Sequence, residues 1–332
     1  MCTHASIESV EGNQYWARTM DFPQDYFSVG GKVTFFPKGT PLKFYSKEIN
    51  SGYDIIGLGL GKENLTLLDG INSAGLVGGL FYFEEATTAT KEELVKQDKI
   101  PQVMNEMVTF FLSQCETIGD VMYLARQVAI VEGSKVGIDA PLPLHMTFMD
   151  HTGKGIVLEP MDNGEFTIHD NVTRTMTNSP TYDWHVTNLR NYVNLKSTNI
   201  DDLQLRDLLI KDIESGSGLI GLPGDYTSPS RFVKITMLTH MMPQPHDTDA
   251  LKALYETFNA VIIPNGIENE GTTSCDSTTY WVGYDVYKKE LLIRAKHNLT
   301  FFTISLENAS QKFGADAGDF AFDLKEQFIS LV

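Results

Sequence analysis

The chain opens with the stretch Met1-Cys2-Thr3-His4-Ala5-Ser6, which places a cysteine directly after the initiator methionine. If Met1 is removed, Cys2 carries both a thiol and a free α-amine. An α-amine titrates near ~8 and a thiol near ~8.5, so each group can exchange a proton around neutral pH. The amine can act as the base and the sulfur as the nucleophile, so this one residue supplies both groups that covalent catalysis needs.

Length and composition indicate a soluble globular protein with a large core. The 332 residues are 42% hydrophobic and 21% charged, and no repeat or low-complexity tract interrupts them. A chain of this size exceeds the usual domain of roughly 100–200 residues but can form one large layered domain. The formal net charge of -17 argues against nucleic acid and anionic membrane surfaces as partners, because both are bound through basic patches.

The sequence also predicts where the protein works and what it lacks. No stretch approaches the ~20 apolar residues that cross a bilayer, and the first residues lack the basic and apolar regions of a signal peptide. We therefore expect a cytoplasmic protein with no membrane association. Cys2, Cys115 and Cys275 are too few and too scattered for a disulfide framework or a zinc site, which indicates a reducing compartment. We expect no metal and no cofactor, and Cys115 should be buried.

The first half of the chain predicts strands followed by helices. Short alternating segments at 32–36 and 76–83 are typical of strands. Thr90 and Glu93 form a capping-box pattern, as do Thr117 and Asp120, and each pattern predicts the start of a helix. The expected helices cover 91–98, 101–115 and the residues after Thr117.

The second half predicts strands again, with two helices between them. Strands are expected at 144–150, 155–159 and 165–169, and a long hairpin at 279–296 that turns near 287–289. Helices are expected at 202–214 and 248–260. Strands and helices are thus segregated along the chain, which predicts an α+β fold of stacked layers.

The chemistry of Cys2 requires partners. An acid must position the amine, hydrogen-bond donors must hold an oxyanion, and a cation favours the thiolate. Arg18 and Asp21 lie at the end of a predicted strand that would pair with the strand starting at Cys2. The glycine-rich stretch 216–224 lacks the lysine and the serine or threonine of a phosphate-binding loop, so we interpret it as a loop of the site.

Four ordered motifs carry a resemblance to a known family: Cys2-Thr3, Arg18-Thr19-Met20-Asp21-Phe22, Met176-Thr177-Asn178-Ser179-Pro180 and Gly221-Leu222-Pro223-Gly224-Asp225-Tyr226. Together they resemble the choloylglycine hydrolase family of penicillin V acylases and conjugated bile salt hydrolases. The resemblance implies the four-layer αββα sandwich of the N-terminal nucleophile hydrolases, as a single domain over residues 2–332 with Met1 removed. It also implies hydrolysis of a linear amide through a thioester on the cysteine.

The same resemblance implies roles for other residues. Arg18 and Asp21 match the partners of the thiol and the amine. Asn178 matches the side-chain donor to the oxyanion, and the backbone N–H of Tyr82 would be the second donor. Arg231 matches the active-site arginine that follows the Pro-Gly-Asp loop. Family membership further implies a homotetramer.

Substrate preference depends on Tyr82. Penicillin V acylases resemble this chain in having tyrosine there, whereas bile salt hydrolases usually have asparagine. An aromatic wall suits an aromatic acyl group, and Met20 resembles a pocket residue that would line the same acyl site. The pair Glu84-Glu85 departs from the Pro-Gly that is common in the family and could repel anionic substrates. The sequence therefore favours a penicillin V acylase-like amidase acting on a small-molecule amide.

Several alternatives stay open. Within the enzyme class they are a bile salt hydrolase and an acyl homoserine lactone acylase. From another class, the chain could be an inactive small-molecule binding protein. The histidine pairs His145 with His151 and His240 with His246 lack the spacing of a helical zinc site, and no internal cysteine fits a papain-like motif.

Overall fold

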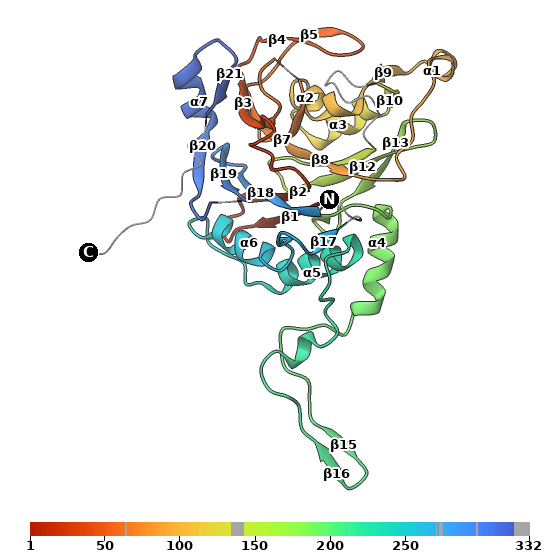
Figure 1. Ribbon diagram of the computed structural model, residues 1–332, viewed down its shortest axis with the longest axis vertical. Coiled ribbons are helices and arrows are strands. Elements are labelled where there is room, and N and C mark those ends of the chain that lie inside the picture. Colours follow the sequence, from red (N-terminus) through yellow and green to blue (C-terminus); the bar gives the residue numbers. More distant parts are fainter. Residues whose placement is uncertain (64, 134–142, 270, 272–274, 297, 322–332) are drawn as a thin grey trace, which may run out of the picture.

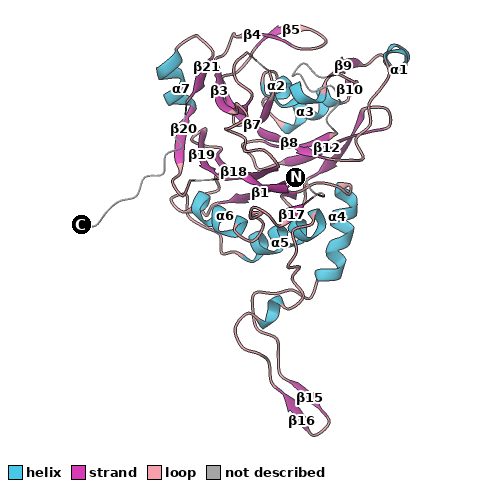
Figure 2. Ribbon diagram, viewed as in Figure 1, coloured by secondary structure: helices cyan, strands magenta, loops and turns pink. Residues whose placement is uncertain are grey.

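The fold places two β-sheets face to face between layers of helices. This computed structural model describes residues 1–332 except 64, 134–142, 270, 272–274, 297 and 322–332. Both sheets lie in the middle of the molecule, and helices cover their outer faces (Figures 1 and 2). The α+β class and the αββα arrangement expected from the sequence are confirmed. Residues 322–332 of the single domain expected over 2–332 lie outside the described residues.

The smaller sheet holds the N-terminal strand and is built from segments that are distant in the sequence. It has seven strands in the order β14-β1-β2-β18-β19-β20, with β17 paired to β18. Neighbours on the main path are antiparallel. Their bounds are β14 (Thr175–Met176), β1 (Cys2–Glu8), β2 (Gln14–Phe22), β18 (Cys275–Asp285), β19 (Glu290–Ala295), β20 (Phe302–Ser305) and β17 (Glu268–Asn269).

The larger sheet has ten strands in the order β21-β3-β6-β7-β8-β11-β12-β13-β10-β9. Their bounds are β21 (Gly318–Phe320), β3 (Lys32–Phe36), β6 (Ile55–Gly59), β7 (Leu67–Asn72), β8 (Val77–Tyr82), β11 (Leu144–Met149), β12 (Gly155–Met161), β13 (Glu165–Asp170), β10 (Val128–Ile130) and β9 (Ile100–Gln102). Two small hairpins lie apart from both sheets: β4 (Pro41–Lys43) with β5 (Glu48–Asn50), and β15 (Leu203–Leu205) with β16 (Leu208–Ile210).

Helices form the outer layers. On the side of the larger sheet are α1 (Lys91–Gln97), the 3₁₀ turn η1 (Met104–Glu106), α2 (Met107–Leu112) and α3 (Ile118–Ala125). On the side of the smaller sheet are α4 (Tyr182–Asn188), α5 (Ser228–Met241) and α6 (Ala250–Phe258). The 3₁₀ turn η2 (Leu189–Tyr192) directly follows α4 in the chain, and η3 (Ser217–Leu219) precedes α5. Beside β20 and β21 lies α7 (Leu306–Phe313).

Three hydrophobic cores separate the four layers. The central core lies between the sheets and includes Cys2, Trp16 and Phe81, all buried. A second core joins the larger sheet to α2 and α3, and a third joins β1 and β2 to α5 and α6. Because both faces of β1 and β2 are covered, these strands are buried almost throughout instead of alternating between buried and exposed residues.

Most of the expected elements are confirmed. Capping boxes at Thr90 and Thr117 begin α1 and α3. The strands expected at 32–36, 76–83, 144–150, 155–159 and 165–169 correspond to β3, β8, β11, β12 and β13. The expected hairpin over 279–296 is formed by β18 and β19, and α6 falls within the helix expected at 248–260. Cys115 is buried, as expected.

Two expected helices are wrong in whole or in part. Residues 202–214 contain the hairpin β15–β16, in which Leu205 is opposite Leu208 and Arg206 has a left-handed φ of 55° at the turn. The helix expected at 101–115 begins only at Met107, because residues 100–102 form β9 and pair with β10. Proline is tolerated at Pro101 because β9 is the edge strand of its sheet. Among the described residues, none of the helices is both long enough and apolar enough to cross a membrane.

Candidate active site

Cys2 is the first residue of β1, and its side chain points into the space between the two sheets. It pairs with Met20 of β2 and is only 3% exposed. Its Sγ atom accepts a hydrogen bond of 2.7 Å from Nη2 of Arg18 and lies 3.7 Å from Sδ of Met20. A cysteine thiol is therefore held between a guanidinium and a thioether.

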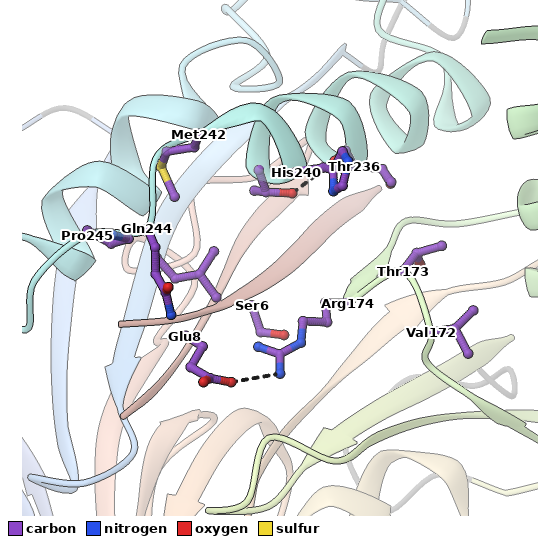
Figure 3. Close-up of a pocket in the computed structure, with 12 residues that line it drawn as sticks. Ser6, Glu8, Val172, Thr173, Arg174, Thr236, His240, Met242, Gln244 and Pro245 are labelled. Atoms are coloured by element: carbon purple, nitrogen blue, oxygen red, sulfur yellow. Dashed lines mark hydrogen bonds and ion pairs between the residues drawn. The ribbon is translucent and has the colours of Figure 1, made fainter. Parts of the chain in front are cut away.

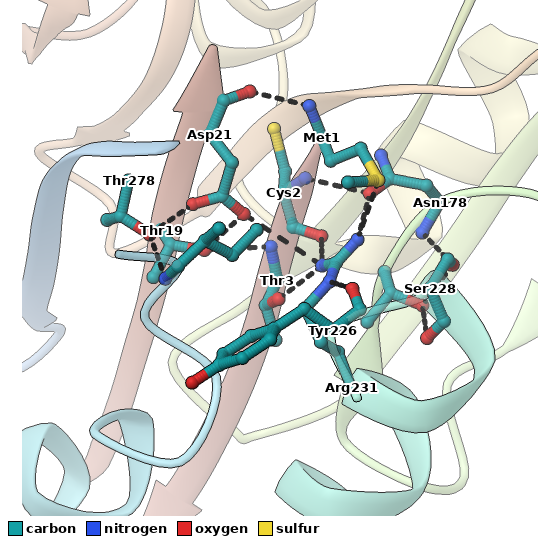
Figure 4. A network of polar contacts seen from close by, with 12 residues as sticks. Met1, Cys2, Thr3, Thr19, Asp21, Asn178, Tyr226, Ser228, Arg231 and Thr278 are labelled. Atoms are coloured by element: carbon teal, nitrogen blue, oxygen red, sulfur yellow. Dashed lines mark hydrogen bonds and ion pairs between the residues drawn. The ribbon is translucent and has the colours of Figure 1, made fainter. Parts of the chain in front are cut away.

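The α-amino group belongs to Met1 in this structure. It donates a 2.5 Å hydrogen bond to the carbonyl oxygen of Asp21 and lies 3.3 Å from a carboxylate oxygen of Asp276. The backbone N–H of Cys2 donates to Oδ1 of Asn178 at 2.7 Å (Figure 4). Removal of Met1 would turn this same nitrogen into a free amine.

Arg18 is fully buried, and backbone carbonyls fix its guanidinium. Its Nη1 donates to the carbonyls of Leu68 (3.0 Å) and Leu80 (2.8 Å) in the larger sheet. The ring of Phe81 lies under the guanidinium, with 4.4 Å between Cζ and the ring centroid. Because these acceptors come from the opposite sheet, packing of the two sheets determines where the guanidinium meets the sulfur.

Asp21 is also fully buried, at the end of β2, and hydroxyl groups hold it. Its Oδ1 accepts a 2.5 Å hydrogen bond from Thr278, and its Oδ2 accepts one of 3.1 Å from Thr19. Burial raises the pKa of Asp21, while the positive charge of Arg231, with Nη1 3.9 Å from Oδ2, opposes that shift. The carboxyl is thus positioned beside the start of β1 (Figure 4).

Asn178 joins Cys2 to Tyr82. Its Oδ1 accepts from the Cys2 N–H and from Nη2 of Arg231 (2.9 Å), and its Nδ2 donates to the carbonyl of Tyr82 at 2.7 Å. The side-chain amide is therefore next to the last residue of β8, on the cysteine side of the site. The two groups expected to donate to an oxyanion, the Asn178 amide and the backbone of Tyr82, lie together.

Arg231 comes from α5 and is fully buried under β1. Its Nη1 donates to the carbonyl of Cys2 and to Oγ1 of Thr3, both at 2.6 Å, and its Nε donates to the carbonyl of Tyr226 at 2.8 Å. Figure 4 shows its guanidinium between these groups and Asn178. The sequence did not predict α5, although Pro229 in the first turn is a typical signal for a helix start.

The surroundings of the thiol provide a partly open aromatic and sulfur surface. Tyr82 is 43% exposed, and Met20 is half-buried beside Cys2. The exposed pair 84–85 is tied to the Asn178 segment, because Ser179 accepts from the Glu84 N–H at 2.9 Å and donates to the Glu85 carboxylate at 2.5 Å. Two carboxylates therefore lie near the residues that carry the amide donor.

Sequence reasoning missed the residues that support Asn178. Ser228 Oγ accepts from the Asn178 N–H at 3.0 Å, and Nε2 of His185 lies 2.8 Å from the Asn178 carbonyl. Burial lowers the pKa of His185 to about 4, although its hydrogen bond with Asn178 opposes the shift, so the ring is neutral near pH 7. Nothing in the local sequence around His185 indicates which atom its ring contacts.

The stretch 216–224, which we interpreted as a loop of the site, leads into the residues that carry Arg231. At its start, Gly218 accepts from the N–H of Lys196 and Ser217 accepts from that of Ile200. The residues that follow the stretch, Asp225 and Tyr226, contact α5 and Arg231. Asp225 accepts hydrogen bonds from Thr227 and Ser230 at the start of α5 and so fixes the helix that carries Arg231.

A hollow of about 440 Å³ lies apart from Cys2, between β1, α5 and residues 172–174 (Figure 3). Two of its lining residues, Arg174 and Glu8, form an ion pair at 3.4 Å. Its lining includes none of the residues predicted from the motifs. Across the described part of the chain, histidine, cysteine, aspartate and glutamate side chains form no group of three that could hold a metal ion.

Comparison with known sequences yields one family and several curated relatives. The family model for linear amide C–N hydrolases, choloylglycine hydrolase family, matches residues 2–319. A bile salt hydrolase/transferase of Clostridium perfringens is 29% identical over 84% of this chain and 84% of its own length. A bile salt hydrolase/transferase of Bifidobacterium longum is 27% identical over 86% of this chain and 88% of its own length.

Solved structures share the fold. A mutant of the conjugated bile acid hydrolase from Clostridium perfringens aligns with a TM-score of 0.89 and 25% identity, over 100% of both chains. A penicillin V acylase from Agrobacterium tumefaciens aligns with a TM-score of 0.75 and 18% identity, over 96% of this chain and 90% of that chain. The second likeness is one of fold alone.

Proposed function

This chain belongs to the linear amide C–N hydrolases of the choloylglycine hydrolase family, and we propose that Cys2 is the nucleophile with which it cleaves its amide. The observation that carries this proposal is the 2.7 Å contact between the Cys2 sulfur and the buried guanidinium of Arg18. A permanent cation beside a thiol favours the thiolate, which is the reactive form. The membership itself, and the amide hydrolase activity expected from the motifs, are confirmed.

The proposed reaction begins after Met1 has been removed. The α-amine of Cys2 takes the thiol proton, and the sulfur attacks the amide carbonyl carbon. The carbonyl π electrons move to oxygen and form a tetrahedral oxyanion. When the oxyanion collapses, the C–N bond breaks and the ammonium of Cys2 gives its proton to the leaving amine. Water, deprotonated by the same amine, then attacks the thioester, and its collapse releases the carboxylic acid and restores the thiol.

Each surrounding residue has a defined part in this proposal. Arg18 would stabilise the thiolate, and Asp21 would orient the ammonium. Asn178 Nδ2 and the backbone N–H of Tyr82 would donate to the oxyanion. In this structure Nδ2 donates to the Tyr82 carbonyl, so the oxyanion would have to accept from Nδ2 alongside that carbonyl or in its place. Arg231 would hold β1 in place through the Cys2 carbonyl.

For the substrate we propose an amide with an aromatic or apolar acyl group, as in penicillin V. The exposed ring of Tyr82 and the thioether of Met20 support this choice, since both offer apolar contact near the sulfur. A conjugated bile salt is the second candidate, because the curated relatives reported above are bile salt hydrolases. Tyr82 argues against it, because a tyrosine ring there offers less hydrogen bonding to a conjugate or steroid group.

We further propose a cytoplasmic homotetramer. The arm, defined as residues 197–217, projects from the body of the molecule (Figure 1). It exposes large apolar side chains: Ile200, Leu203, Leu205, Leu208, Leu209, Ile210 and Ile213. A two-stranded hairpin is only marginally stable alone in water, so contact with a second copy would explain why these side chains are apolar. A solution mass near that of one chain would contradict the tetramer.

The proposed function is tested by amine release from three amides in parallel. Processed protein is incubated with penicillin V, glycocholate and taurocholate, and the new primary amine is quantified, with Cys2→Ala as the control. Faster release from penicillin V supports the aromatic acyl preference. Faster release from the bile salts keeps the Cys2 mechanism but overturns the proposed preference. No release from any of them would contradict both candidates and favour an acyl homoserine lactone or an inactive binding protein.

A further inference from the structure

A buried carboxyl group, Asp69, lies between the two sheets at the side of Arg18. It sits on β7 of the larger sheet and is fully buried. Its Oδ2 accepts a 2.6 Å hydrogen bond from the Tyr280 hydroxyl, and its Oδ1 accepts a 2.5 Å hydrogen bond from that of Tyr284. Both tyrosines belong to β18 of the smaller sheet. None of the motifs includes Asp69, and the reaction outlined above does not use it.

Arg18 connects this carboxyl group to the nucleophile. Its Nη1 lies 3.5 Å from Oδ2 of Asp69, while its Nη2 contacts the Cys2 sulfur at 2.7 Å. One guanidinium therefore has a carboxyl on one side and the sulfur on the other. Its remaining hydrogen-bond acceptors are the neutral backbone carbonyls of Leu68, Leu80 and Thr19, together with the thioether of Met20.

We propose that Asp69 is a positioning residue that supplies the counter-charge of Arg18 and so limits how strongly the guanidinium holds Cys2 as a thiolate. The inference rests on the proposed function of Cys2 as the nucleophile. Tyr280 and Tyr284 act in the same unit, because their hydroxyls stabilise the ionised carboxyl. Without that ionised carboxyl, the sulfur would be the main partner of a buried cation.

The energetics of burial support this role. A buried guanidinium without a counter-charge is strongly unfavourable, so Arg18 requires an anion nearby. Burial raises the pKa of Asp69, and Arg18 and the two tyrosine hydroxyls oppose that shift. The ionised state of Asp69 thus depends on the three groups that contact it. An attacking thiolate also loses nucleophilicity as its basicity falls, so a thiolate held too tightly would be slow.

Other titratable groups surround this unit, and their charges enter the same balance. The strands of the smaller sheet provide Cys2 and His4 from β1, Arg18 and Asp21 from β2, and Tyr280 and Tyr284 from β18. The segment after β2 provides Tyr26. Burial lowers the pKa of His4 to about 3, so its ring is neutral near pH 7. Among these groups, Asp69 is the carboxyl that accepts from both tyrosine hydroxyls and lies 3.5 Å from the Arg18 guanidinium.

The test measures the reaction of Cys2 with a dipyridyl disulfide as a function of pH, with the modified residue identified by mass spectrometry. The Cys2 thiolate attacks one sulfur, a mixed disulfide forms and pyridinethiolate leaves. In Asp69→Asn, which keeps the shape of the side chain but removes its charge, we expect the midpoint of the pH profile to fall by about one unit. At high pH, where Cys2 is a thiolate in both proteins, the rate constant should fall about 3-fold.

Two further variants keep the test decisive. The double variant Tyr280→Phe with Tyr284→Phe should also lower the midpoint, because it removes the hydroxyls that stabilise the ionised carboxyl. If Asp69→Asn does not fold, this double variant alone tests the proposal. Tyr26→Phe removes a buried hydroxyl that bonds to the carbonyls of Gly59 and Lys32 instead, and it should leave the midpoint unchanged. A loss of thermal stability without a shift of the midpoint, or a shift upwards, would overturn the proposal.

The same measurement separates this inference from the proposed function. Disulfide exchange does not require turnover, so Cys2 can be followed whether or not an amide is cleaved. If wild-type protein hydrolyses no amide, the proposed function fails whatever the midpoint does. If wild-type protein hydrolyses its amide and the midpoint of Asp69→Asn is unchanged, only the role of Asp69 fails.

Discussion

The Cys2 site and the arm (residues 197–217) differ in which kind of side chain they bury and which they expose to water. In the site, charged side chains are removed from water: Arg18, Asp21 and Arg231 are each 0% exposed. In the arm, large aliphatic side chains are left in water, with Leu203 59% exposed and Leu208 60% exposed. Each region departs from the ordinary partition of polar and apolar residues, in opposite directions.

The contrast between these two regions indicates which of them serves chemistry and which serves assembly. Buried charges cost folding free energy unless partners compensate them, so a buried network of this kind needs a reason such as catalysis. An exposed apolar surface contributes nothing to the stability of an isolated chain, so its reason lies outside the chain. On this comparison, changes in the site should alter chemistry without altering assembly, and changes in the arm should do the reverse.

The largest effect is expected from Cys2→Ala, because the variant lacks the thiol that accepts a hydrogen bond from Arg18. Amine release should fall to background on every amide tested, while the oligomeric mass and the melting temperature stay close to those of the wild type. Cys275→Ala is the matched control, since this half-buried cysteine lies outside the site and its replacement should leave activity intact. Activity surviving in Cys2→Ala would show that amide cleavage does not depend on the Cys2 site.

A smaller loss is expected from Asn178→Ala. Removing one oxyanion donor typically lowers kcat about 10²–10³-fold, and here the variant also deprives the Cys2 nitrogen of its acceptor. Steady-state kinetics should show the change mainly in kcat, with KM little affected. An equal loss in Asn191→Ala, at an exposed position between α4 and the arm, would show that the effect is not specific to the site.

Glu159→Gln should destabilise the start of α4, just after Asn178 in the chain, because the buried Glu159 carboxylate accepts from the Tyr182 N–H at 2.8 Å. Burial would raise the pKa of Glu159, but its contacts with His145 (3.5 Å) and His169 (3.2 Å) outweigh burial and lower the pKa to about 2. A folded-state pKa below the unfolded value of 4.5 means that the contribution is present above pH 4.5 and is lost as the pH falls towards 2. Its size at pH 7 is about 3 kcal/mol.

Chemical denaturation at several pH values checks this prediction. The difference in unfolding free energy between wild type and Glu159→Gln should shrink as the pH falls from 5 to 3. Glu165→Gln is the control, because its carboxylate pairs with Lys99 near the surface and should contribute less than about 1 kcal/mol. A difference between wild type and Glu159→Gln that stays constant over this pH range would contradict the assignment.

In the arm, the paired changes Leu205→Asp and Leu208→Asp should separate the subunits. Two charges on the apolar hairpin oppose its burial against another chain, so the solution mass should fall about fourfold if the protein is a tetramer. The rate of the chemical step should change less than about twofold, because β15 and β16 lie well away from β1, which carries Cys2 (Figure 1). Tyr123→Asp, at another exposed position, is the control and should leave the mass unchanged. A wild-type monomer would contradict the proposed role of the arm.

The smallest effect is expected at Tyr82. Tyr82→Asn should lower the ratio of penicillin V to glycocholate hydrolysis about 5-fold, because aromatic contacts contribute about 1 kcal/mol. Tyr82→Phe keeps the ring and should preserve the ratio. An unchanged ratio in both variants would mean that the wall of the acyl site is formed elsewhere.

Much of the site could be predicted from the sequence because its central residues lie in short, distinctive motifs. Cys2 and the Arg18–Phe22 stretch belong to neighbouring strands, so local pairing brings Cys2 opposite Met20. The capping boxes at Thr90 and Thr117 depend on contacts three residues apart and were equally predictable. The α+β class followed from the segregation of strands and helices along the chain, and the four-layer αββα arrangement followed from the family resemblance.

The remaining features depend on contacts that no local pattern encodes. Thr278 holds Asp21 across 257 residues, and Asp69 meets Tyr280 across 211. Their side chains are ordinary in sequence and become informative only when the two sheets pack. The hairpin in the arm was mistaken for a helix because its leucines recur at intervals compatible with either structure, and its turn depends on the left-handed Arg206.

The most direct test of the central claim is intact-mass spectrometry of the enzyme quenched in acid during turnover of penicillin V. The account predicts a wild-type species that has lost Met1 and gained one phenoxyacetyl group, located on Cys2 by peptide mapping and absent from Cys2→Ala. Turnover without an acyl group on Cys2, or with the acyl group on another residue, would contradict it.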